Sequence, residues 1–174
     1  MDAKTYEQFP PHLVAPCLAI NIAIYAIGAY LLSRLGLLYM ALYLTFCLCL
    51  EIRLLACHCP NCYYYGHLCA FAKGKISSWF FKKGSPDQFA AKEISWKTMI
   101  PDFLVSLIPI GIGIYLLIRN FSILILALIL LIFALAMPIT GLIRTKIACK
   151  HCKQKTLTCP AEKLFAKKPE ATTN

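Results

Sequence analysis

Four apolar stretches of about twenty residues each constrain the fold more than any other feature of the sequence. They run from about Leu13 to Leu32, Leu35 to Leu55, Met99 to Ile118 and Phe121 to Ile143. A helix needs ~20 residues to cross the hydrocarbon core of a bilayer, so each stretch can span it. The composition agrees, because 59% of the 174 residues are hydrophobic and only 15% are charged. The sequence predicts an all-α integral membrane protein with four transmembrane helices.

The breaks between these stretches are short and pair them into hairpins. Ser33-Arg34 separates the first two stretches, and Arg119-Asn120 separates the last two. Such short breaks favour antiparallel neighbours, so we expect two tandem helical hairpins. The polar residues before Leu13 lack the cationic start and cleavage site of a secretory signal, and the first stretch is therefore expected to be retained.

A cysteine motif, C-x2-C-x6-C, follows each hairpin. The first copy contains Cys59, Cys62 and Cys69, and the second contains Cys149, Cys152 and Cys159. The hairpins also match, because residues 27–34 resemble residues 112–119 and differ from them at two positions. Together these features predict an internal duplication, with repeats at 1–69 and 99–160. Residues 70–98 form a basic, aromatic, interfacial linker in this interpretation, and residues 161–174 form a disordered basic tail.

The distribution of Lys and Arg predicts the orientation. Only Arg34 and Arg119 lie at the breaks inside the hairpins, whereas the linker and tail contain most of the other cations. The positive-inside rule therefore places both termini and both cysteine motifs in the cytoplasm, with the protein integral to the cell membrane. The net charge of +10 lies beside apolar segments, so we expect anionic lipid headgroups as its partner and exclude nucleic acid.

The spacing of the cysteines indicates thiolate chemistry. A C-x2-C turn presents two sulfur ligands to one metal, and thiolates select zinc, copper(I) or iron–sulfur clusters. The predicted ligands are Cys59, Cys62, Cys69, Cys149, Cys152 and Cys159, with Cys57 and His67 as possible additions. His67 would complete a site within the first copy, but Leu157 takes the equivalent place in the second, and an exposed side chain is the preferred interpretation of His67 and His151.

Two arrangements of the metal site remain open. Each motif can bind its own metal, or Cys59, Cys62, Cys149 and Cys152 can form one four-thiolate site with the third cysteines as neighbours. The sequence does not choose between structural zinc and an iron–sulfur cluster. Either cofactor suits a redox or assembly accessory component that works with a membrane or cytoplasmic protein partner.

Thiol–disulfide exchange is the alternative function. Lysines beside the second motif would lower the pKa of its thiols and favour exchange. Against this, C-x2-C redox pairs usually belong to a strand–helix unit, and none is predicted. The chain shows no nucleophile–base pair, phosphate loop or carboxylate pair typical of a stand-alone enzyme.

Several smaller features carry structural predictions. We expect Gly28, Gly111 and Gly113 to allow close helix packing, and Pro109 and Pro138 to kink their helices. Cys17, Cys47 and Cys49 are expected in the core, whereas His12, Glu51 and Asp102 are expected to reach the interface. Residues 76–84 suit a headgroup-level segment, and Ser85-Pro86 suits the start of a short helix.

Overall fold

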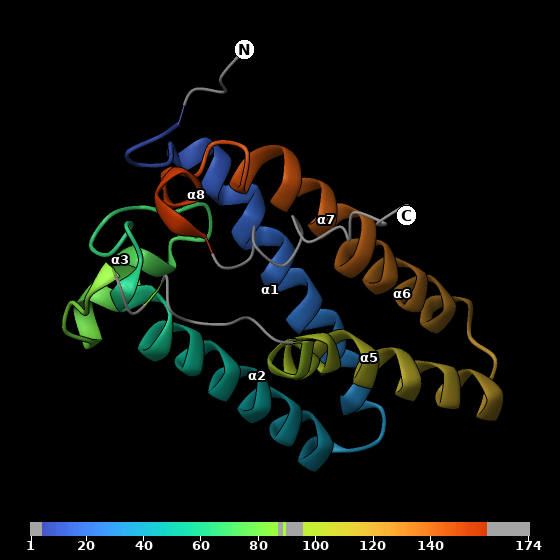
Figure 1. Cartoon of the computed structure of the whole chain (residues 1–174). Coiled ribbons are helices and arrows are strands. Elements are labelled where there is room, and N and C mark those ends of the chain that lie inside the picture. The colour runs from blue at the N-terminus through green and yellow to red at the C-terminus, as the bar shows by residue number, and fades with distance from the viewer. Residues whose placement is uncertain (1–4, 87–88, 90–95, 160–174) are drawn as a thin grey trace, which may run out of the picture.

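The computed structural model describes residues 5–86, 89 and 96–159, which form helices and loops with one isolated β-bridge. The elements appear in Figure 1. The long helices are α1 (Pro11–Ser33), α2 (Leu37–Cys57), α5 (Trp96–Arg119) and α6 (Ile123–Ala134). Shorter elements are η1 (Cys59–Asn61), α3 (Lys73–Phe80), η2 (Leu135–Ile139), α7 (Thr140–Ile143), η3 (Arg144–Ala148) and α8 (Lys153–Thr158). The helix expected from Ser85-Pro86 and the basic tail fall largely or wholly outside the described residues.

Four helical runs are long and apolar enough to cross a membrane, as the sequence predicts. They span Pro11–Ser33, Leu37–Asn61, Met99–Arg119 and Ile123–Ala148. The last run is continuous through α6, η2, α7 and η3. Many large apolar side chains on these helices face outward, which suits contact with lipid rather than with water. The prediction of an all-helical fold with four helices able to span a membrane is confirmed.

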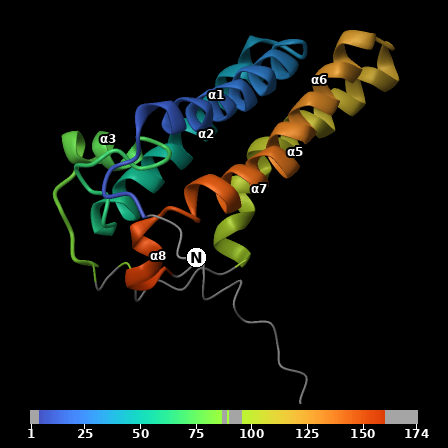
Figure 2. The same cartoon turned by 90° about the horizontal axis from the view of Figure 1, so that it is seen from above.

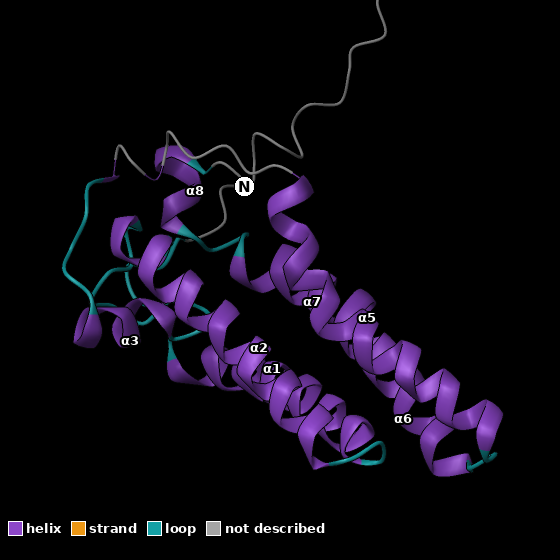
Figure 3. Ribbon diagram, turned by 90° about the horizontal axis from the view of Figure 1, so that it is seen from below, coloured by secondary structure: helices purple, strands orange, loops and turns teal. Residues whose placement is uncertain are grey.

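The helices form two hairpins that pack through α1 and α5. Helix α1 contacts α2 and α5, and α6 contacts α5 and α1. Both hairpin turns lie at one end of the bundle, while the N-terminal segment, α3 and α8 lie at the other (Figures 2 and 3). Both cysteine motifs are therefore at the same end of the protein.

Glycines at corresponding positions bring the helices of each hairpin together. A methyl group added at Gly28 would collide with the phenol ring of Tyr43 in α2. A methyl group added at Gly113 would lie 2.7 Å from Cγ1 of Ile129 in α6. The packing role is confirmed for these two glycines. It is wrong for Gly111, which has nothing within 4 Å of an added methyl group.

The two mid-span prolines have different local consequences. Pro109 removes an amide donor from α5, and the hydroxyl of Tyr43 donates to the freed carbonyl of Val105 at 2.9 Å. Pro138 lies inside the π-helical turn η2, where the hydroxyl of Thr140 donates to the carbonyl of Leu135 at 2.6 Å. The distortion expected at Pro138 thus takes the form of a π turn.

Candidate thiolate site

The two C-x2-C turns have closely similar backbone geometry. In the first, the N–H of Cys62 donates to the carbonyl of Cys59 at 3.2 Å. In the second, the N–H of Cys152 donates to the carbonyl of Cys149 at 3.4 Å. Both second cysteines are extended, with φ and ψ of −84° and 151° in one and −81° and 119° in the other. The second copy therefore repeats the turn of the first.

The segments that follow the turns differ. After Cys62 the chain forms a loop that contains Cys69 and leads into α3. After Cys152 it enters α8 at once, and Cys159 follows the end of that helix. The equal six-residue spacing therefore does not produce equal backbone paths to the third cysteine.

Direct hydrogen bonds join the two turns. The side-chain oxygen of Gln154 accepts from the backbone N–H of Tyr63 at 2.7 Å. The backbone N–H of Lys153 donates to the phenol oxygen of Tyr64 at 3.0 Å. Gln154 and Tyr64 are 5% and 2% exposed, so both contacts are shielded from water. Each motif thus supplies a buried side chain that satisfies the backbone of the other.

The N-terminal segment lies between the motifs and binds both. Tyr6 forms an isolated parallel bridge with Cys152, and its N–H donates to the carbonyl of His151 at 3.0 Å. Its carbonyl accepts from the hydroxyl of Tyr64 at 2.6 Å. The Tyr6 and His151 rings lie 5.1 Å apart, and His151 is half-buried, so the expectation of an exposed His151 is wrong.

Cysteines of both motifs pack on one apolar cluster. Its buried members are Phe9, Val14, Tyr64, Ala70 and Ala148. Three half-buried cysteines pack against it: Cys62, Cys69 and Cys152. These hydrophobic surroundings disfavour a negative charge on the cysteine sulfurs.

Burial disfavours the thiolate form of the central cysteines. It is the largest cause that raises the pKa of the Cys62 thiol to about 11. Negative charge on three other motif cysteines also raises that pKa: Cys152, Cys69 and Cys159. Burial likewise raises the pKa of the Cys152 thiol. The lowered pKa expected for the thiols of the second motif is therefore wrong for Cys152.

The remaining candidate ligands have different surroundings. His67 is exposed, as preferred from the sequence, and the carbonyl of Cys57 accepts from the Asn61 amide at 3.4 Å. The sulfur of Cys69 accepts from the backbone N–H of Gly74 at 3.5 Å. Within the described part of the chain, no three His, Cys, Asp or Glu side chains are arranged to hold a metal ion.

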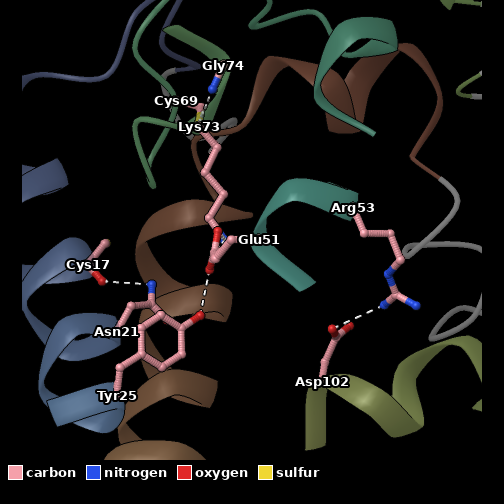
Figure 4. Close-up of polar contacts among 9 residues, drawn as sticks. All are labelled: Cys17, Asn21, Tyr25, Glu51, Arg53, Cys69, Lys73, Gly74 and Asp102. Atoms are coloured by element: carbon pink, nitrogen blue, oxygen red, sulfur yellow. Dashed lines mark hydrogen bonds and ion pairs between the residues drawn. The ribbon is translucent and has the colours of Figure 1, made fainter. Parts of the chain in front are cut away.

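A polar network lies beside the cysteines and connects three helices (Figure 4). The carboxylate of Glu51 in α2 accepts from the hydroxyl of Tyr25 in α1 at 2.6 Å. It also pairs with the ammonium of Lys73 in α3 at 2.8 Å. The Glu51 side chain is 23% exposed and pairs with α3 at the cysteine end of the bundle, and its place at the interface stays a prediction. Asp102 does lie at an exposed position, where it pairs with Arg53 at 3.3 Å.

The three cysteines within the spans divide into two groups. Cys17 and Cys47 are 1% and 4% exposed, so their predicted place in the core is confirmed. Cys49 is exposed, and its predicted place in the core is wrong.

The fold and the clustered cysteines define a class: an all-helical, cysteine-rich protein with four helices able to span a membrane. Comparison of the chain with protein-family models, with curated proteins and with solved structures finds no match.

Proposed function

We propose that the two C-x2-C turns form one thiolate metal site, with structural zinc as its first occupant. The proposed ligands are Cys59, Cys62, Cys149 and Cys152, and Cys69 and Cys159 adjoin the site. The metal would lock the two hairpins together at the cytoplasmic face. The protein would then act as an assembly or redox accessory component that presents this face to a protein partner.

The contact between the motifs carries the proposal. Residues about ninety positions apart meet where Gln154 accepts from the backbone of Tyr63 and where Tyr64 accepts from the backbone of Lys153. Beside these contacts, Cys62 and Cys152 pack against the same apolar cluster. A structural zinc site is closed and tetrahedral, and two matched C-x2-C turns supply four thiolates for it. Occupation would require the side chains to turn toward the ion, a coupling usual for structural metals.

The cytoplasmic orientation rests on charge. Both motifs and α3 lie at the end of the bundle opposite the hairpin turns. Lysines are concentrated near the motifs, whereas Arg34 and Arg119 are the cations at the turns. The positive-inside rule favours the lysine-rich end as cytoplasmic.

Metal analysis of single-cysteine variants tests the proposal. The full-length protein would be purified anaerobically in detergent, its visible spectrum recorded and its metals counted. Cys62→Ser and Cys152→Ser change one motif each, while Cys49→Ser changes an exposed cysteine outside both motifs. A shared site predicts one zinc per chain in the wild type and in Cys49→Ser, and its loss in either motif variant.

Three other results would change the number of sites, the identity of the metal or the function proposed here. Separate sites predict two metals in the wild type and one in each motif variant. Brown protein with iron and sulfide would assign a cluster and favour electron transfer to a partner. Metal-free protein with reactive thiols would refute the metal site and leave thiol exchange.

A further inference from the structure

A polar cavity lies at the end of the bundle opposite the cysteines. It has a volume of about 400 Å³ and is lined by Tyr30, Ser33, Arg34, Leu116, Asn120 and Ile125. These residues come from both hairpins, at the end where both turns lie (Figures 2 and 3). The volume is within the range of small-molecule sites. Its distance from the motifs makes the inference below independent of the metal proposal.

The cavity is cationic, and no carboxylate lines it. Arg34 lines it, and the sequence contains no Asp or Glu in residues 8–50 or 103–161. Within the part of the chain that the structure describes, Arg34 forms no ion pair. Its guanidinium carbon instead lies 6.0 Å from the centre of the Tyr30 ring. An arginine at a membrane boundary without a carboxylate partner suits an external anion.

Helix ends of both polarities border the cavity, and the start of α6 is the one that favours an anion. Ile125 lies in the first turn of α6, and Ser122 at the start of that helix makes no side-chain capping bond. The first N–H groups of a helix carry partial positive charge and attract anions. The ends of α1 and α5 have the opposite polarity. The carbonyls of Leu31 and Leu32 accept bonds from Arg34 and Leu35, and the carbonyl of Leu116 accepts from Asn120, so part of the negative charge at these ends is satisfied.

The second repeat lacks an equivalent open arginine. Arg119 corresponds to Arg34 in the repeat, but its Nε–H donates to the hydroxyl of Tyr115 at 3.1 Å. Arg119 does not line the cavity. The guanidinium carbon of Arg119 also lies over a tyrosine ring, 5.7 Å from the centre of Tyr115. The two arginines therefore have equal charge, equivalent helix positions and similar tyrosine contacts, but of the two Arg34 alone lines the cavity, which makes Arg119 a matched control.

We propose that this cavity binds a phosphate group, with Arg34 as its principal ligand and the side chains of Tyr30 and Asn120 as further donors. The cavity adjoins the ends of α1 and α5, and a helix of this length ends near the headgroup layer. A lipid phosphodiester at that level is one source of the group, and a soluble phosphate is the other. Guanidinium binds phosphate through charge-assisted hydrogen bonds.

Ligand-dependent thermal unfolding tests the site on the full-length protein in maltoside detergent. The probes are dioctanoylphosphatidylglycerol, dioctanoylglycerol, which lacks the phosphate, and sodium phosphate at matched ionic strength. The variants are Arg34→Gln, Arg34→Lys and Arg119→Gln. We expect Arg34→Gln to weaken binding of the phosphatidylglycerol about tenfold or more. Arg34→Lys should retain part of the affinity, and Arg119→Gln should stay within about twofold of the wild type.

The results distinguish a lipid headgroup from a soluble phosphate, and both of these from the absence of a specific site. Stabilisation by the phospholipid alone supports a lipid headgroup, and equal stabilisation by sodium phosphate supports a soluble ligand. Equal losses in Arg34→Gln and Arg119→Gln would mean general charge attraction and would overturn the site. Equal stabilisation by dioctanoylglycerol would overturn it as well, because that probe has no phosphate. Unliganded unfolding temperatures of all variants report whether each one folds.

Discussion

Tyr43 makes two contacts inside the apolar bundle, one through its ring and one through its hydroxyl group. Its ring lies against Gly28, which has no side chain to obstruct it. Its hydroxyl then reaches the carbonyl of Val105, the group left without a helical donor by Pro109. Tyr43 is 3% exposed, so no water replaces that bond. The residue therefore connects the first hairpin to the second.

We predict that Tyr43→Phe destabilises the protein by about 1–2 kcal/mol, because it leaves a buried carbonyl unpaired. Thermal or denaturant unfolding in detergent would measure the loss. Tyr39→Phe is the matched control, since Tyr39 is 51% exposed on the same helix. Equal stability of both variants would show that the Val105 bond contributes nothing.

The residues of the cysteine site differ in how far the sequence predicts them. Cys59, Cys62, Cys149 and Cys152 could be selected as candidates from spacing alone. Gln154 and Tyr64, which join the motifs, could not, because their role depends on backbone groups that are distant in sequence. The run of three tyrosines after Cys62 was the only local signal near them.

At the scale of elements, Glu51 helps to attach α3 to the bundle. It binds Tyr25 of α1 and Lys73 of α3 from its position near the end of α2. The hydroxyl of Ser77 in α3 also donates to the carbonyl of Leu55 at 2.9 Å. Trp79 and Phe80, at the other end of α3, remain 69% and 74% exposed. That exposure agrees with a headgroup-level segment anchored at one end by polar contacts.

We predict that Glu51→Gln loosens α3 while the spans persist. The amide oxygen can still accept from Tyr25, but the partly buried Lys73 loses its counter-ion, at a cost of about 1–3 kcal/mol. Hydrogen exchange should accelerate in α3 and stay unchanged in α8, which serves as the internal control. Asp102→Asn provides a second control, because its pair with Arg53 is largely exposed and should contribute ~0–1 kcal/mol. Unchanged exchange in α3 would contradict the role of Glu51.

At the scale of the whole molecule, the main consequence of the fold is that the two ends of the bundle have different chemistry. Clustered cysteines and lysines lie at one end, and two arginines and a polar cavity lie at the other. The two hairpins are parallel to each other, since each begins and ends at the cysteine end. This arrangement, the matched turns and the matched glycines agree with the internal duplication expected from the sequence, which stays a prediction because the chain paths after the two turns differ.

The proposed orientation predicts which groups meet reagents outside the cell. A membrane-impermeant maleimide should label an Asn120→Cys variant in intact cells, because Asn120 lies at the outer hairpin turn. A Gln8→Cys variant should react only after the membrane is permeabilised, since the exposed Gln8 lies in the N-terminal segment at the proposed cytoplasmic end. The wild type measures the background from the native cysteines. Labelling of the Gln8→Cys variant above that background in intact cells would reverse the orientation.

The number of long helices, their pairing into hairpins and the repeated cysteine spacing can all be predicted from the sequence. These properties follow from local hydrophobicity and short connections, which act over neighbouring residues. Only the tertiary structure decided that Gln154 and Tyr64 bring the two motifs together, that Glu51 is paired, and that Arg34 but not Arg119 borders a cavity. These contacts depend on which faces of the helices pack together. The sequence does not reveal that packing, because nearly every face of these helices is apolar.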